Sequence, residues 1–166
     1  MEKTAQAIQQ RGLRRRLIAG SAALLTLGLG YYFVVRGLGS LHLAHLIPEA
    51  ATHEAALTLP GILMSVTDSL PTFLHVFALI LLTGAFTDTR STHNRFRICS
   101  SWFLINLVFE VGQLAGPTDA AGTLPVVGNY LAAGTFSLLD VGAAVAGSIA
   151  GYLLLNKQNK SEADHD

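Results

Sequence analysis

Four long apolar runs limit this chain to very few folds. They cover residues 17–35, 70–86, 98–116 and 137–155. Each is close to the roughly 20 mostly apolar residues that a helix needs to cross about 30 Å of hydrocarbon. Because the runs are continuously apolar and do not alternate, they predict helices and not the strands of a membrane barrel. The expected fold is all-α, a polytopic membrane protein with four transmembrane helices.

The composition agrees with a membrane protein. Hydrophobic residues make up 51% of the chain and charged residues only 13%, whereas a soluble domain carries about 25% charged residues. The 11 Lys and Arg residues balance the 11 Asp and Glu residues, so the chain has no basic field that would hold nucleic acid. Cys99 is the single cysteine, which excludes an internal disulfide and a CxxC motif.

The positive charges predict how the four helices are oriented. Nearly all of the Lys and Arg residues precede the first run, separate the second from the third, or follow the fourth; only Arg36 falls on the other side. Because cytoplasmic loops collect positive charge, both termini are expected in the cytoplasm. The predicted organisation is a basic cytoplasmic N-terminus (1–16), a transmembrane domain (17–155) and a disordered cytoplasmic tail (156–166).

The first apolar run could also be a signal sequence. Residues 14–16 are three arginines before an apolar run, which is also typical of a secretory or twin-arginine signal. The run is longer than a usual signal core and no A-x-A site follows it, so a membrane span is favoured.

The external loop 37–69 is expected to lie on the outer surface as one or two interfacial helices, broken at Pro48 and Pro60.

Three ionisable residues fall inside the predicted spans: His75, Glu110 and Asp140. At about 1.5 Å per residue they lie roughly 8, 9 and 5–9 Å from the outer ends of their helices, within one layer of the outer leaflet. Such groups are costly in a bilayer and by default mark function. Gln113 shares a helix face with Glu110, and Asp68 lies just outside the second span.

These three residues allow both functional and structural interpretations. An imidazolium at His75 between the two carboxylates would form a buried triad, suited to acid–base chemistry, a proton relay or structure. Ser137-x-x-Asp140 matches a helix capping box, and His75 alone is typical of a hydrogen bond between helices. Glu110 lies late in an apolar helix, away from the end whose dipole favours an acid, so for Glu110 function is favoured. Gly147-x-x-x-Gly151 predicts a close helix crossing.

A metal site is a weaker possibility. His42 and His45, with Glu49 or His53, have a spacing that could bind zinc. Loop histidines without a supporting fourth ligand are usually polar surface, so no metal is expected. No P-loop, GxGxxG, GxSxG or HExxH motif occurs in the chain, and no cofactor is expected.

The polar residues of the last two spans resemble the VanZ-like family. Glu110-Val-Gly-Gln113, a polar loop, and then Asp140 with Gly147 are similar to the family pattern E-x-x-Q, loop, D-x-x-x-N-x-x-G. The segment 68–75, with its terminal Asp and His, is similar to the family's D…H stretch at the start of a membrane helix. The resemblance covers about residues 68–155.

The chain departs from the family pattern at three points. Gly134-Thr135 stands where the family often has an arginine, Ala144 stands where it has an asparagine, and no lysine follows Asp68. The resemblance implies a small multi-pass protein of the bacterial inner (cytoplasmic) membrane, connected with the cell envelope or with the response to glycopeptide antibiotics.

The favoured function is non-enzymatic binding of an envelope lipid or a lipid-linked headgroup at the outer leaflet. The expected ligand-binding residues are Asp68, His75, Glu110, Gln113 and Asp140. One alternative is a structural or regulatory subunit of a membrane complex, with a membrane-protein partner or as a homo-oligomer. A second alternative is an intramembrane hydrolase or transferase that uses His75 and Glu110 with Asp140, although no nucleophile or oxyanion donors are evident.

Overall fold

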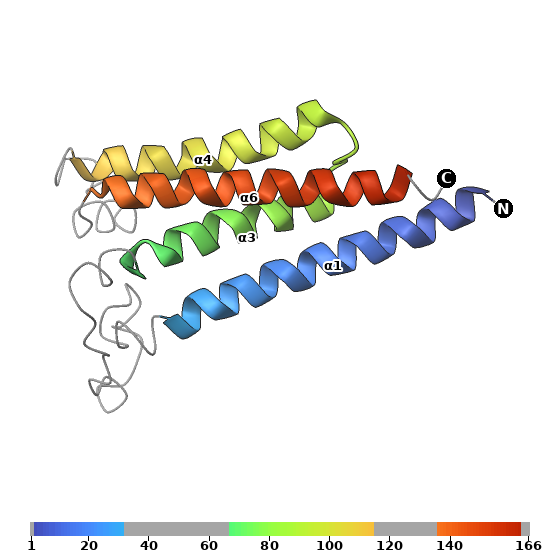
Figure 1. Cartoon of the computed structure of the whole chain (residues 1–166), viewed down its shortest axis with the longest axis horizontal. Helices are drawn as coiled ribbons and strands as arrows, with labels where there is room; N and C mark the ends of the chain where they lie inside the picture. Colours follow the sequence, from blue (N-terminus) through green and yellow to red (C-terminus); the bar gives the residue numbers. More distant parts are fainter. Residues whose placement is uncertain (1, 32–66, 115–135, 164–166) are drawn as a thin grey trace, which may run out of the picture.

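The computed structural model describes residues 2–31, 67–114 and 136–163. These residues form four α-helices and, within the same ranges, no strand. The helices are α1 (Glu2–Tyr31), α3 (Leu70–Phe86), α4 (Thr92–Leu114) and α6 (Leu138–Ala163), and they lie lengthwise in one bundle (Figure 1). The all-α prediction is confirmed.

Helix α3 is the central element, and it packs against α1, α4 and α6. Apart from Thr72, His75 and Thr83 its residues are apolar, and its buried side chains contact three neighbouring helices. A Cβ added at Gly20 would lie 3.5 Å from Leu81, and one at Gly28 would lie 3.9 Å from Leu74. Residue numbers therefore rise along α1 as they fall along α3, so these two helices are antiparallel (Figure 1).

Helices α3 and α6 run parallel and cross closely at two glycines. A Cβ on Gly147 would lie 2.8 Å from the carbonyl oxygen of Phe73, and a Cβ on Gly151 would lie 2.7 Å from Cγ2 of Ile80. Any larger side chain would push the helices apart. The close crossing predicted from the Gly-x-x-x-Gly spacing is confirmed.

The core of the bundle forms where α3 faces its neighbours. It is made of buried side chains from all four helices: Leu17, Val76, Ile80, Leu81, Ile98, Cys99, Ala144 and Leu155. On α4, Trp102 adds a polar link, because its Nε1–H donates to Oγ1 of Thr83 at 2.9 Å. This bond joins the middle of α4 to the end of α3.

A buried arginine of α4 joins the turn after α3 to Asn156 of α6. Arg95 is 5% exposed, and its Nη1 donates to the carbonyl oxygens of Thr89 and Arg90 at 2.7 and 2.8 Å. Its Nη2 donates to Oγ1 of Thr92 at 2.9 Å and to Oδ1 of Asn156 at 3.3 Å. The guanidinium therefore holds carbonyl and side-chain oxygens together at this end of the bundle.

The helix boundaries agree with the predicted spans in part. Helix α3 covers residues 70–86, as predicted. Helix α4 begins at Thr92, earlier than the predicted 98, and α6 continues to Ala163. Helix α6 thus extends into the segment from residue 156 that is expected from the sequence to be a disordered tail. The segment 156–163 contains Gln, Lys, Glu and Ala but no Gly or Pro, which allows the helix to continue.

Large apolar side chains remain exposed on the outer faces of the bundle. Val108 on α4 is 70% exposed and Leu138 on α6 is 76% exposed. Others with more than half of their surface exposed are Leu27, Leu29, Phe86, Phe96, Leu104, Val111, Leu114, Ile149 and Leu153. By length and hydropathy, one helix among the described residues could cross a membrane (Leu138–Gln158), and α3 is a shorter apolar helix. The interfacial helices expected in loop 37–69 fall largely outside the described residues.

Candidate functional site

Glu110 is the most buried carboxylate of the candidate site. It is 7% exposed and lies near the end of α4. Its Oε2 accepts a hydrogen bond from the backbone N–H of Ser137 at 3.2 Å. Ser137 directly precedes α6, and the first backbone N–H groups of a helix have no partner within the helix. The buried carboxylate therefore satisfies a backbone donor at the start of a different helix.

The bond to Glu110 changes the capping box that the sequence predicts at Ser137. Half of the box is present, because Oγ of Ser137 accepts the backbone N–H of Asp140 at 3.4 Å. In a complete box the acid at Asp140 would accept the N–H of Ser137 in return, but Glu110 takes that donor. Asp140 Oδ1 instead accepts the hydroxyl of Thr72 on α3 at 3.2 Å. Glu110, Ser137, Asp140 and Thr72 thus form one cluster across α4, α6 and α3, here called the outer cluster.

The two carboxylates of the outer cluster keep acceptor capacity. The hydrogen bonds to Glu110 and Asp140 use one oxygen of each, and a carboxylate can accept about four. Within residues 67–75, 110–114 and 136–140, which surround the cluster, there is no Lys or Arg. A group that brings N–H or O–H donors would complement this end of the bundle.

Asp68 lies at the same end and joins α3 to α1. Its Oδ1 accepts the hydroxyl of Tyr31 at 3.5 Å, a long and therefore weak hydrogen bond. Tyr31 is buried at the end of α1, and sequence reasoning did not include it in the site. Its position late in an apolar run was the available signal, since Tyr is enriched at membrane–water interfaces.

His75 lies at the expected level of α3, but it is exposed. It is three residues beyond Thr72, which is about 4.5 Å along the helix axis. Thr72 bonds to Asp140 on α6, and Val76 packs against Gly147 of the same helix. His75 is rotated by about 100° from Val76 and is exposed. The possible buried triad, with the imidazolium of His75 between Glu110 and Asp140, is therefore not formed.

The other predicted residues contribute less to the site. Gln113 is half-buried one turn after Glu110, at the end of α4. The possible zinc ligands His42, His45, Glu49 and His53 lie outside the described residues. Within residues 2–31, 67–114 and 136–163, no group of three or more His, Cys, Asp or Glu side chains is placed to hold a metal ion.

Comparison with protein-family models, with curated proteins and with solved structures finds no match to this chain. The resemblance to the VanZ-like family therefore remains a prediction carried by Glu110, Gln113, Asp140 and Gly147 and by the segment 68–75.

Proposed function

We propose that this chain is a four-span protein of the bacterial inner membrane, similar to the VanZ-like family, with both termini in the cytoplasm. Three observations support the proposal. Successive helices run in alternating directions. Helix α3 is antiparallel to α1 and parallel to α6. The bonds from Trp102 to Thr83 and from Arg95 to Asn156 join α4 to α3 and α6, and α4 runs antiparallel to both. Exposed apolar side chains cover the outer faces of α1, α4 and α6.

The third observation is the separation of charge between the two ends of the bundle. The carboxylates of Asp68, Glu110 and Asp140 lie at one end, with hydroxyl and backbone donors as their partners. The arginines of α1 and of the turn between α3 and α4 lie at the other end. This separation agrees with a membrane orientation in which the basic end faces the cytoplasm. The outer cluster then lies at the level of the outer leaflet.

The proposed function of the outer cluster is to bind the polar headgroup of an envelope lipid or of a lipid-linked envelope precursor. The observation that carries this proposal is the unused acceptor capacity of Glu110 and Asp140 at an end that has no described cation. A headgroup with ammonium or sugar hydroxyl donors fits such a site. Gln113, Asp68 and the exposed His75 would add polar groups around it.

Lipid analysis of purified protein tests the binding proposal. Wild type, Glu110→Gln and Asp140→Asn are purified with native lipid, and the lipids that copurify are compared by mass spectrometry. Asp88→Asn is a matched control, because Asp88 is an exposed carboxylate at the opposite end. We expect one lipid class to be enriched in wild type and in the control and to be lost from the two cluster variants. Equal lipid profiles in all four proteins would contradict the proposal.

A structural role is the second candidate function, and the same hydrogen bonds favour it. The bonds from Ser137 to Glu110 and from Thr72 to Asp140 join three helices. If the cluster only holds the bundle together, the two cluster variants melt at lower temperature and keep the wild-type lipid profile. The function would then be that of a subunit in a membrane complex or a homo-oligomer. The hydrolase alternative lacks comparable support, since exposed His75 makes none of the cluster's hydrogen bonds.

A further inference from the structure

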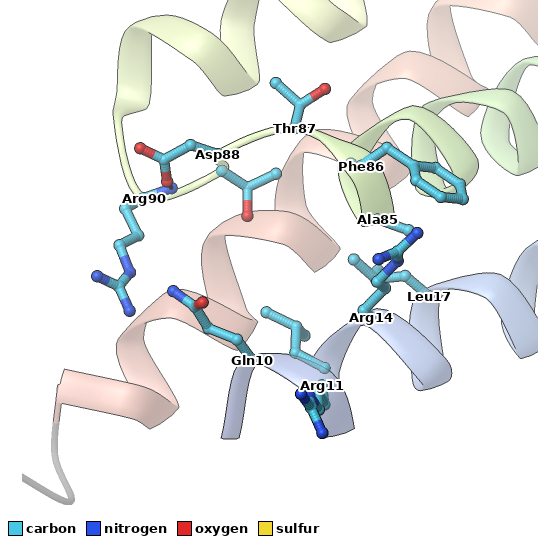
Figure 2. A pocket seen from close by; sticks show the side chains of 12 residues that line it. Gln10, Arg11, Arg14, Leu17, Ala85, Phe86, Thr87, Asp88 and Arg90 are labelled. Atoms are coloured by element: carbon cyan, nitrogen blue, oxygen red, sulfur yellow. Dashed lines mark hydrogen bonds between the residues drawn. The ribbon is translucent and has the colours of Figure 1, made fainter. Parts of the chain in front are cut away.

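The bundle has a cavity at its basic end and an apolar groove between α4 and α6. The cavity, of about 520 Å³, lies between α1 and the turn that follows α3. Its guanidinium groups do not converge on one position, because Arg14 lies beside Phe86 toward one end and Arg90 lies toward the other (Figure 2). The groove, of about 430 Å³, runs along residues 96–103 of α4 and 145–153 of α6 and is here called the α4–α6 groove.

The α4–α6 groove is open to the outer surface of the bundle. Phe96 on α4 and Ile149 and Leu153 on α6 line it and are more than half exposed. Buried Cys99 and half-buried Phe103 also line it from α4. In the proposed orientation these surfaces lie within the hydrocarbon of the bilayer, so a lipid chain can enter the groove from the side.

The groove and the outer cluster lie on the same pair of helices at successive depths. Glu110 is seven residues after Phe103 on α4, and Asp140 is five residues before Val145 on α6. At about 1.5 Å per residue these intervals are about 10 and 8 Å. Because α4 and α6 are antiparallel, both walls of the groove lead to the outer cluster. A headgroup at the cluster therefore places its chains at the level of the groove.

Asn106 lies in the interval between the groove and the outer cluster. It is three residues after Phe103 and four residues before Glu110, and positions with these spacings share one face of a helix. The side chain of Asn106 is half-buried, and among the described residues its amide makes no hydrogen bond. Two unused N–H donors thus lie on the route from the cluster to the groove.

Ser148 supplies a second donor without a partner. It lines the groove from α6, and its buried Oγ has no hydrogen-bond partner in the described part of the chain. An unpaired amide or hydroxyl is costly in hydrocarbon, so Asn106 and Ser148 indicate an acceptor that a ligand brings. In a lipid with acyl chains, the acceptors between the headgroup and the chains are the ester carbonyls.

We infer that the α4–α6 groove holds an acyl chain of the lipid whose headgroup the outer cluster binds, and that Asn106 donates a hydrogen bond to an ester carbonyl of that lipid; this rests on the headgroup-binding function proposed above. The groove alone selects little, because lipid tails are as apolar as the side chains of a membrane helix. The carboxylates of the cluster favour an ammonium group. The ligand class is therefore a diacyl lipid with an ammonium headgroup.

Photocrosslinking of the full chain tests the inference. The protein is placed in nanodiscs of phosphatidylglycerol, with a trace of phosphatidylethanolamine that carries a diazirine in the middle of one acyl chain. Ser100→Phe and Val145→Phe fill the groove from its two walls. Ser101→Phe is the matched control, because Ser101 is exposed and lies outside the groove lining. Elution volume and helical content confirm that each variant is folded.

We expect the label in wild type to concentrate on peptides that contain residues 96–103 and 145–153. Ser100→Phe and Val145→Phe lose most of this label, and Ser101→Phe keeps it. Asn106→Leu lowers the label by about three- to tenfold, as expected for one hydrogen bond, and leaves the melting temperature unchanged, because its amide has no described partner.

Two results separate this inference from the headgroup proposal. Equal labelling of the groove in Ser100→Phe and Ser101→Phe, or in Asn106→Leu and wild type, would overturn the inference while a loss of label in Glu110→Gln leaves the headgroup proposal standing. Unchanged labelling in Glu110→Gln would contradict the headgroup proposal and, with it, the inference.

Discussion

Glu110 on α4 accepts the backbone N–H of Ser137, the residue that begins α6, at 3.2 Å. A helix start is therefore capped by a carboxylate from a neighbouring helix and not only by its own residues. Asp140, which would serve that function in a capping box, instead bonds to Thr72 on α3. Because Ser137 and Asp140 each bond to a residue of another helix, the outer cluster joins α3, α4 and α6.

Removal of the Glu110 carboxylate is expected to destabilise the bundle. Glu110→Ala leaves the half-buried N–H of Ser137 without its acceptor, so the free energy of unfolding falls by about 1 kcal/mol or more. Glu110→Gln keeps an acceptor oxygen and loses less. Thermal and denaturant melts of both variants in the same detergent measure the difference. Equal losses in the two variants would mean that charge, and not the hydrogen bond to Ser137, stabilises this end.

Helix α6 is expected to tolerate a larger side chain at Gly142 but not at Gly147, where it crosses α3. Gly147→Ala places a Cβ 2.8 Å from the carbonyl oxygen of Phe73, and such overpacking costs about 1–3 kcal/mol. Gly142 is the matched control, because a Cβ there meets nothing within 4 Å. Gly142→Ala is expected to be neutral or stabilising by about 0.5–1 kcal/mol. A melting temperature that falls equally in both variants would contradict the close crossing of α3 and α6.

Substitution of the buried Arg95 is expected to lower the stability of the bundle more than other substitutions at the basic end. Arg95→Gln removes the donors of the Thr89 and Arg90 carbonyls, and the free energy of unfolding falls by about 2–3 kcal/mol. Arg97 lies two residues further and is exposed, so Arg97→Gln changes stability by less than about 0.5 kcal/mol. Denaturant titration compares the two. A small effect at Arg95 would show that the turn is held by other contacts.

The hydrogen bond from Trp102 to Thr83 is expected to couple α4 to α3. Trp102→Phe and Thr83→Val each remove one partner of a 2.9 Å bond. A double-mutant cycle isolates their interaction, for which we expect about 0.5–1.5 kcal/mol. A coupling energy near zero would mean that the two side chains contribute only by packing.

Much of the fold could be predicted from the sequence, because the apolar runs and the glycine spacing are local signals. Residues 70–86 form a helix within the predicted limits, and Gly147 with Gly151 allows the expected crossing. The extent of α6 was not predicted, since a polar tail of good helix formers carries no signal that separates helix from disorder. The hydropathy pattern predicts the apolar part of that helix but not its continuation to Ala163.

The candidate site was less predictable, because it depends on helix rotation and on partners far apart in sequence. Depth along each helix could be counted, and it placed Glu110 and Asp140 in one layer. It could not show that His75 is exposed and that Thr72, three residues earlier, faces α6. Thr72 and Tyr31 are ordinary residues in apolar segments, so their hydrogen bonds to Asp140 and Asp68 were visible only in the structure.

In the proposed orientation the bundle spans a membrane, with the outer cluster and the basic end on opposite sides. Cysteine labelling tests it most directly, in a Cys99→Ala background that carries either Thr118→Cys, between the third and fourth proposed spans, or His93→Cys, in the exposed first turn of α4. In intact spheroplasts, a membrane-impermeant maleimide is expected to label the cysteine at position 118 at once and the cysteine at position 93 only after lysis. Labelling of both cysteines before lysis, or of neither, would contradict the four-span orientation.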